Sequence, residues 1–172
     1  MRTSFDALDL RIIRLLQSDA RLSGAVIARR LGVSERTVRN RIDRLTQSDA
    51  IIPTVVINPK VFGYLTAVDV FCEVEVNLME QASRALAALP EVNYVAYSTG
   101  DQDISIQALL ESSDLVYDFV QKVARVPGVR RTRTVLVPRV IKDTYMWTPP
   151  AGDFQEYPGH LDPESADERP AL

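Results

Sequence analysis

Residues 23–45 contain two amphipathic helical patterns separated by a turn of three residues, and this spacing restricts the fold more than any other feature of the chain. Ser23 is a residue type that caps helices, and apolar residues recur at helical spacing after it. Gly32 ends the pattern and permits the left-handed backbone that a sharp turn needs. Ser34 then caps a second helix, so the segment predicts a helix-turn-helix, with a preceding helix capped by Asp6 or Asp9.

The helix that starts after Ser34 separates apolar from charged side chains. At about 100° per residue, one narrow stripe collects the apolar side chains Val38, Ile42 and Leu45. The opposite side and its flanks carry Arg36, Arg39, Asn40, Arg41, Asp43 and Arg44. Four arginines in so short a stretch favour an anionic partner over the alternative, a face that meets only water.

Positive charge is concentrated near the start of the chain, although the net charge is −3. Residues 1–55 hold ten arginines against six carboxylates, whereas residues 148–172 hold one arginine against six carboxylates. A basic first third in an acidic protein indicates that a polyanion binds locally. Because the last segment is rich in Pro, Gly and acid and has no periodicity, we expect a disordered tail there.

The composition excludes several kinds of chemistry. With one cysteine, Cys72, and one histidine, His160, a single chain cannot assemble a His/Cys metal site or a Cys–His nucleophile pair. We therefore expect no catalytic residue, no metal and no cofactor. No apolar run approaches the roughly 20 residues of a membrane helix, and no signal peptide is evident, so we expect a cytoplasmic protein that meets no membrane.

Residues 66–142 show the same order of elements twice. β-rich stretches at 67–76 and 104–110 each precede a helical stretch, at 79–88 and 113–125. Each helix is followed by a further β-rich stretch, at 92–99 and 129–137. Together with the helix-turn-helix, this order predicts an α+β chain whose second domain is a ferredoxin-like βαββαβ fold with its helices on one face. The β-branched stretch at 54–57 predicts a short strand leading into a linker.

The outer face of that sheet is expected to mix apolar and charged side chains. Along 67–76 the inward set is Val70, Cys72, Val74 and Val76. Phe71, Val95 and Tyr97 then lie outside among charged residues. Burial against a second subunit accounts for this mixture, and an exposed face with scattered apolar residues is the alternative.

Several stretches over residues 5–147 resemble, in order and spacing, the Lrp/AsnC (feast/famine) transcription regulators. They are LDLRIIRLLQSDARLSGAVIARRLGVSERTVRNRIDRL, INPKVFG, STGDQD, VPGV and TRTVLV. The resemblance implies a winged or extended helix-turn-helix domain at 1–50, a linker strand at 51–65, and an effector-binding domain at 66–147 that dimerises or assembles further. The acidic tail at 148–172 and Asp49, where a glycine-containing turn is usual, depart from the family pattern.

The resemblance also implies an effector site. Family members bind small effectors, usually amino acids, near the turn between the second and third strands, at subunit contacts. Asp101 and Asp103 offer carboxylates to an ammonium group, and backbone N–H groups near Gly100 suit a carboxylate. Gln102 replaces a common aromatic or apolar residue, and a turn without a ligand is the alternative. The candidate effector residues are Ser98, Thr99, Gly100, Asp101, Gln102, Asp103 and Thr134.

These observations predict a sequence-specific regulator that binds double-stranded DNA, responds to an amino acid or related metabolite, and self-associates. Arg36, Thr37 and Asn40 are expected at base edges. Phosphate contacts are expected from Arg39, Arg41 and Arg44. With the helix cap, the candidate DNA-binding residues are Ser34, Arg36, Thr37, Arg39, Asn40, Arg41 and Arg44.

Two other functions compete with this prediction. Sirohaem decarboxylases resemble the same family and use histidine and arginine in the sensing domain, but this chain has no histidine before His160. A ligand-independent architectural protein that wraps DNA is the other alternative, and its binding would depend little on sequence or on any amino acid.

Overall fold

The computed structural model describes residues 5–142, 145, 147–150 and 154–159. The chain folds into two compact units: residues 56–141 form one, and residues 1–55 together with 142–172 form the other. Each unit has its own apolar core. Among the described residues, no helix combines the length and the apolar character that crossing a membrane requires.

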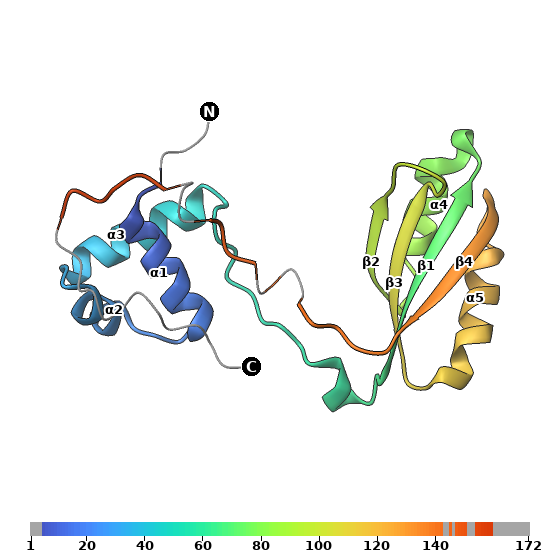
Figure 1. The fold of residues 1–172 in the computed structure, drawn as a ribbon, viewed down its shortest axis with the longest axis horizontal. Coiled ribbons are helices and arrows are strands. Elements are labelled where there is room, and N and C mark those ends of the chain that lie inside the picture. The colour runs from blue at the N-terminus through green and yellow to red at the C-terminus, as the bar shows by residue number, and fades with distance from the viewer. Residues whose placement is uncertain (1–4, 143–144, 146, 151–153, 160–172) are drawn as a thin grey trace. The chain divides into compact units, whose positions relative to one another are not determined.

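Three helices build the first unit, in the order α1 (Ala7–Ser18), α2 (Gly24–Leu31) and α3 (Glu35–Gln47) (Figure 1). Asp6, Ser23 and Ser34 are the caps, and each accepts a hydrogen bond from a backbone N–H in the first turn of its helix. Gly32 has a φ of 67°, so its backbone is left-handed where α2 ends. The predicted helix-turn-helix is confirmed.

One apolar cluster joins the three helices. Its fully buried members include Leu8, Ile12, Ile27, Leu31, Val38 and Leu45. Ile42 is only partly buried against the same cluster. Because Val38 and Leu45 are both buried, the inward stripe of α3 is fixed, and the residues on its other side face outward.

The segment after α3 departs from the expected short strand. Asp49 takes a φ of 55°, in the left-handed region that asparagine and aspartate tolerate better than most other side chains. Residues 54–57 form no strand in the described chain, and Val55 is 86% exposed. A strand needs a neighbour for its N–H and C=O groups, and no described segment pairs there, so that prediction is wrong. A short 3₁₀ turn, Pro59–Phe62, comes next.

The second unit is a four-stranded antiparallel sheet with two helices, the predicted ferredoxin-like fold. Its strands are β1 (Thr66–Val74), β2 (Val92–Tyr97), β3 (Ile104–Leu110) and β4 (Val129–Val137), and its helices are α4 (Met79–Ala87) and α5 (Val116–Ala124). Short 3₁₀ turns at Val76–Leu78 and Ser113–Leu115 lead into the helices. The spatial order is β2-β3-β1-β4, and both helices cover one face (Figure 1).

Alternate residues of the central strands face these helices. Val68, Val70 and Cys72 from β1 are fully buried with Phe119 of α5 and other side chains of the cluster. Burial raises the pKa of the Cys72 thiol to about 11. The expectation that Val76 also points inward is wrong, because β1 ends at Val74 and Val76 is 87% exposed in the adjoining turn.

The outer face of the sheet also differs from the prediction. A bulge between Val92 and Tyr94 shifts the register of β2, so Val95 pairs with Ile106 on the helix-covered side. Tyr97 lies on that side too, where its hydroxyl is 3.0 Å from Ser83 Oγ of α4. Val95 and Tyr97 are therefore not outer-face residues. Tyr94, 55% exposed, takes that place beside Gln107.

The described residues of the segment 148–172 make specific contacts, contrary to the expected disorder. Thr148 Oγ1 donates to Gln17 Oε1 of α1 at 2.7 Å, and Phe154 and Tyr157 pack on the apolar cluster of the three helices. Composition alone suggested disorder, but the partly buried rings of Phe154 and Tyr157 contribute apolar contacts that favour the ordering of this short segment. His160 and the residues after it lie outside the described residues.

Candidate nucleic-acid interface and effector pocket

The outward side of α3 presents a compact set of polar side chains, which we call the α3 face: Arg36, Thr37, Arg39 and Asn40. All but the half-buried Thr37 are exposed. Ser34 serves as the helix cap, since its hydroxyl accepts from the Thr37 N–H at 3.1 Å. Arg39 Nη2 donates to Glu35 Oε1 at 3.0 Å, but both side chains are half or more exposed, so this pair is weak and Arg39 remains available to a phosphate.

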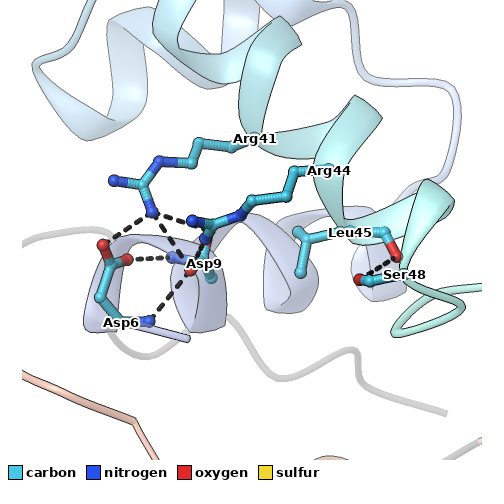
Figure 2. Close-up of polar contacts among 6 residues, drawn as sticks. All are labelled: Asp6, Asp9, Arg41, Arg44, Leu45 and Ser48. Atoms are coloured by element: carbon cyan, nitrogen blue, oxygen red, sulfur yellow. Dashed lines mark hydrogen bonds and ion pairs between the residues drawn. The ribbon is translucent and has the colours of Figure 1, made fainter. Parts of the chain in front are cut away.

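Arg41 and Arg44 turn back from α3 onto α1 instead of outward (Figure 2). Arg41 Nη1 donates to Asp6 Oδ2 at 2.7 Å and to both oxygens of Asp9 at 3.2 Å. Arg44 Nη2 donates to Asp9 Oδ2. The Asp9 side chain has no exposed surface, so its charge depends on these two guanidinium groups. Both arginines thus have carboxylate partners within the domain, and the phosphate contacts expected of them stay a prediction.

The start of α1 belongs to the same network. Asp6 Oδ1 accepts from the Asp9 N–H, and Asp9 Oδ2 accepts from the Asp6 N–H, both at 3.0 Å, which forms a capping box (Figure 2). Burial by itself raises the pKa of Asp6, but the Asp9 N–H and the Arg41 guanidinium outweigh it and hold that pKa below its ordinary value. Burial acts against the charge of Arg41 as well, yet Asp6 and Asp9 raise its pKa.

A second pair of arginines escaped the sequence prediction. Arg29 and Arg30 lie exposed in the last turn of α2, directly before the turn at Gly32. In a helix-turn-helix the first helix of the motif crosses the DNA backbone. The adjacent pair Arg29 and Arg30 could have indicated this contact from the sequence. The prediction instead concentrated on the four arginines of α3, which is the recognition helix of the motif.

In the second unit, the turn between β2 and β3 is tied to the end of β1. Gly100 has a φ of 118°, which favours glycine. The Asp103 N–H donates to the Cys72 carbonyl at 2.9 Å, and Asp103 Oδ2 accepts from the Val74 N–H at 2.7 Å. The latter bond satisfies a backbone group where the pairing of β1 with β4 shifts between Glu73 and Val74. Asp103 therefore has a structural partner already.

A hollow of about 300 Å³ opens beside this turn. Its lining residues are Asp101, Gln102, Arg131, Thr132 and Arg133. The lining therefore includes one acidic residue, Asp101, and two basic residues of β4, Arg131 and Arg133. Arg133 lies over the Phe71 ring, 4.9 Å from its centroid, and Arg131 Nη1 is 3.7 Å from Glu73 Oε1. Residues of opposite charge in the lining of one hollow suit a zwitterion.

The hollow includes only two of the seven predicted effector residues, Asp101 and Gln102. Those not among its lining are Ser98, Thr99, Gly100, Asp103 and Thr134. Thr134 pairs with Val70, so it lies on the helix-covered side of the sheet. Sequence reasoning missed Arg131, Thr132 and Arg133, because the cationic partner comes from the far end of the chain. The recognised stretch TRTVLV did begin at Thr132.

Two family models match the two parts of this chain. The AsnC-type helix-turn-helix domain matches residues 5–46, and the Lrp/AsnC ligand binding domain matches residues 69–147. The HTH-type transcriptional regulator FL11 of Pyrococcus horikoshii is 30% identical over 145 residues, which cover 84% of this chain and 96% of that protein.

Solved structures share the fold. The structure of E. coli AsnC has a TM-score of 0.76 and 25% identity, and covers 83% of this chain and 99% of its own. A transcriptional regulator from Neisseria meningitidis, in complex with L-Met, has a TM-score of 0.75 and 20% identity, covering 82% of this chain and 94% of its own. At that identity the likeness shows the fold alone.

The low pKa of Asp6 predicts a specific pH dependence of stability. A carboxyl whose pKa is lower in the folded state stabilises the protein above its unfolded pKa of about 4, and that contribution is lost as the pH falls through the folded-state value. Asp6→Asn keeps a capping oxygen but loses the charge, so we expect it to cost about 1–3 kcal/mol at pH 7 and progressively less below about pH 4.

Urea denaturation of the wild type and Asp6→Asn between pH 7 and pH 3 measures this difference. Ile12→Val, a core substitution with no titratable group, is the control, and its cost should stay constant with pH. A constant cost for Asp6→Asn as well would show that the Asp6 charge contributes nothing.

Proposed function

This chain belongs to the Lrp/AsnC family of helix-turn-helix transcriptional regulators, and on that premise we propose that its α3 face reads DNA while the hollow beside Asp101 binds an amino acid. The observation that carries the DNA assignment is the outward set Arg36, Thr37, Arg39 and Asn40, presented by a helix whose Val38 and Leu45 are fully buried. The relatives are named as transcriptional regulators, which supports regulation in preference to an enzymatic role.

The four side chains divide by chemistry. Asn40 has an amide that pairs with adenine, and Arg36 has a fork that pairs with guanine, so we assign these two to base edges. Thr37, beside them in the first turns, takes either kind of contact. Arg39 on the flank, with Arg29 and Arg30 of α2, is assigned to phosphates. Arg41 and Arg44 are left out of this interface because Asp6 and Asp9 engage them.

The effector assignment rests on residues of opposite charge that line one hollow. An amino acid carries an ammonium group that suits Asp101 and a carboxylate that suits Arg131 or Arg133. Gln102 adds an amide that both donates and accepts, which favours a polar or amide-bearing side chain over a bulky aromatic one. Binding there would couple to DNA affinity or assembly, typically by about 1–3 kcal/mol.

We also propose that the outer face of the sheet meets a second copy of the chain. Gln107 Nε2 donates to Asp69 Oδ1 at 2.9 Å, and Asn93 Nδ2 donates to Gln107 Oε1 at 3.3 Å, so the polar groups there are largely satisfied among themselves. Tyr94 and the ring of Phe71 add apolar surface to the same face. A face of this kind loses little on burial against a symmetric copy.

Arg36→Ala and Arg41→Ala, on the same helix, are expected to fail in different ways. Arg36→Ala should weaken DNA binding and lower the salt slope by about one, with the melting temperature unchanged. Arg41→Ala should lower the stability of the helical unit by about 1–3 kcal/mol, because Asp6 and Asp9 lose a partner. Fluorescence anisotropy at several salt concentrations and thermal melts separate these effects, with Arg125→Ala on the second unit as the charge-matched control. Wild-type affinity in Arg36→Ala would refute the α3 assignment to DNA.

Asp101→Asn is expected to abolish the thermal shift that a responsive amino acid causes, while DNA affinity without ligand stays at the wild-type value. Removing the charge takes away the partner of the ammonium group, and Arg133→Gln should act in the same way on the carboxylate. Scanning calorimetry with each of the twenty amino acids identifies the ligand. Asp114→Asn, an exposed carboxylate elsewhere in the same unit, is the control. A shift that survives in both hollow variants places the effector elsewhere.

Tyr94→Arg is expected to reduce self-association, since it puts an unpaired charge into the proposed contact between copies. Tyr117→Arg changes an exposed tyrosine of α5, 71% accessible, on the opposite side of the unit and should leave assembly unchanged. Sedimentation velocity at micromolar concentration measures both. A wild-type chain that sediments as a monomer would contradict the proposed contact.

A further inference from the structure

The described end of the chain returns to the helices, although both matched domains end by residue 147. Residues 154–159, which we call the C-terminal clip, pair with the start of α1 in the parallel sense. The Gln155 N–H donates to the Phe5 carbonyl, and the Ala7 N–H donates to the Gln155 carbonyl, both at 2.8 Å. The clip therefore adds two backbone hydrogen bonds at the point where the Asp6–Asp9 capping box begins.

Aromatic contacts hold the clip in place. The rings of Phe154 and Phe5 lie 6.4 Å apart between centroids, and both side chains pack on the apolar cluster. The Arg41 guanidinium of α3 lies 5.8 Å from the centroid of the Tyr157 ring. A Cβ at Gly159 would lie 2.4 Å from Tyr157 Cε1, so glycine is what lets the chain pass this ring. The clip thus ends against the recognition helix.

The sequence after the clip is acidic. Asp162, Glu164, Asp167 and Glu168 come within nine residues of Gly159, and Arg169 is the only arginine or lysine in the sequence after the clip. Short tethers give effective concentrations in the millimolar range. Tethered carboxylates at that concentration compete with phosphates for arginines, and salt screens this competition over a Debye length of about 8 Å at physiological ionic strength.

We propose that the C-terminal segment is an intramolecular competitor of DNA: the clip anchors it at Arg41, and its carboxylates act on the α3 face. This inference rests on the proposed role of that face in DNA binding. Competition lowers the affinity for DNA of any sequence at low salt and fades as salt screens both partners. The interaction surface is thus the basic side of the helix-turn-helix, and its occupant is the acidic segment of the same chain.

The anchor has a calculable effect. The carboxylates begin three residues after Gly159 but fourteen after Thr148, the next described contact with α1. Since effective concentration falls as the −3/2 power of tether length, releasing the clip should lower it by about three- to tenfold. A variant without the anchor therefore falls between the wild type and a chain without the acidic charges.

The test compares two full-length variants with the same change of net charge. The tail-neutral variant combines Asp162→Asn, Glu164→Gln, Asp167→Asn and Glu168→Gln. The control combines Glu80→Gln, Glu111→Gln, Asp114→Asn and Asp118→Asn, four exposed carboxylates of the second unit. Fluorescence anisotropy with a random-sequence duplex at about 50 mM salt should show the tail-neutral variant binding roughly three- to tenfold more tightly than the control, and at about 300 mM salt less than twofold. Equal affinities at low salt would overturn the proposal.

A third chain, with Phe154→Ser and Tyr157→Ser, tests the anchor. It keeps every carboxylate and is expected to bind DNA with an affinity between those of the wild type and the tail-neutral variant, once circular dichroism shows that its helices are intact. Wild-type affinity would refute the anchoring role of the clip. If the wild type and the control bind no DNA, the proposed function itself fails, whereas intact binding with equal affinities rejects only the competition.

Discussion

The Asp9 carboxylate has no exposed surface, and a charge in that position is tolerated only because Arg41 and Arg44 pair with it. The pairing joins α1 to α3, so it constrains the orientation of the recognition helix within its unit. It also consumes two of the four arginines of α3. The outward side of the helix therefore keeps Arg36, Arg39 and the amide of Asn40, which take no part in this internal network.

The second unit uses a carboxylate in a comparable way. Asp103 ties the β2–β3 turn to the irregular end of β1, where its side chain accepts from the Val74 N–H. Asp103 is thus engaged, and Asp101 is the acidic residue that lines the hollow together with Arg131 and Arg133. In both units, then, one acidic residue sets the local geometry: Asp9 through two arginine side chains, and Asp103 through a backbone N–H group.

The described part of the C-terminal segment also contacts the helical unit. Phe154 and Tyr157 pack on the helical core, and Tyr157 stacks beside the Arg41 that already serves Asp6 and Asp9. The segment lies outside both matched domains and yet touches the network that orients α3. A change in the contact between Tyr157 and Arg41 therefore alters the surroundings of the recognition helix, because the same guanidinium group also pairs with Asp6 and Asp9.

Local patterns in the sequence determined the helix-turn-helix, its caps at Ser23 and Ser34, and the order of strands and helices, since capping and periodicity involve residues close in the chain. Tertiary structure alone decided which arginines face outward, because Arg41 meets Asp9 across more than thirty residues. Tertiary structure likewise decided that a bulge in β2 places Val95 and Tyr97 on the helix-covered side of the sheet. It also placed Arg131 and Arg133 in the lining of the same hollow as Asp101 and paired the clip with the start of α1. These outcomes depend on partners distant in sequence, which neither periodicity nor composition identifies.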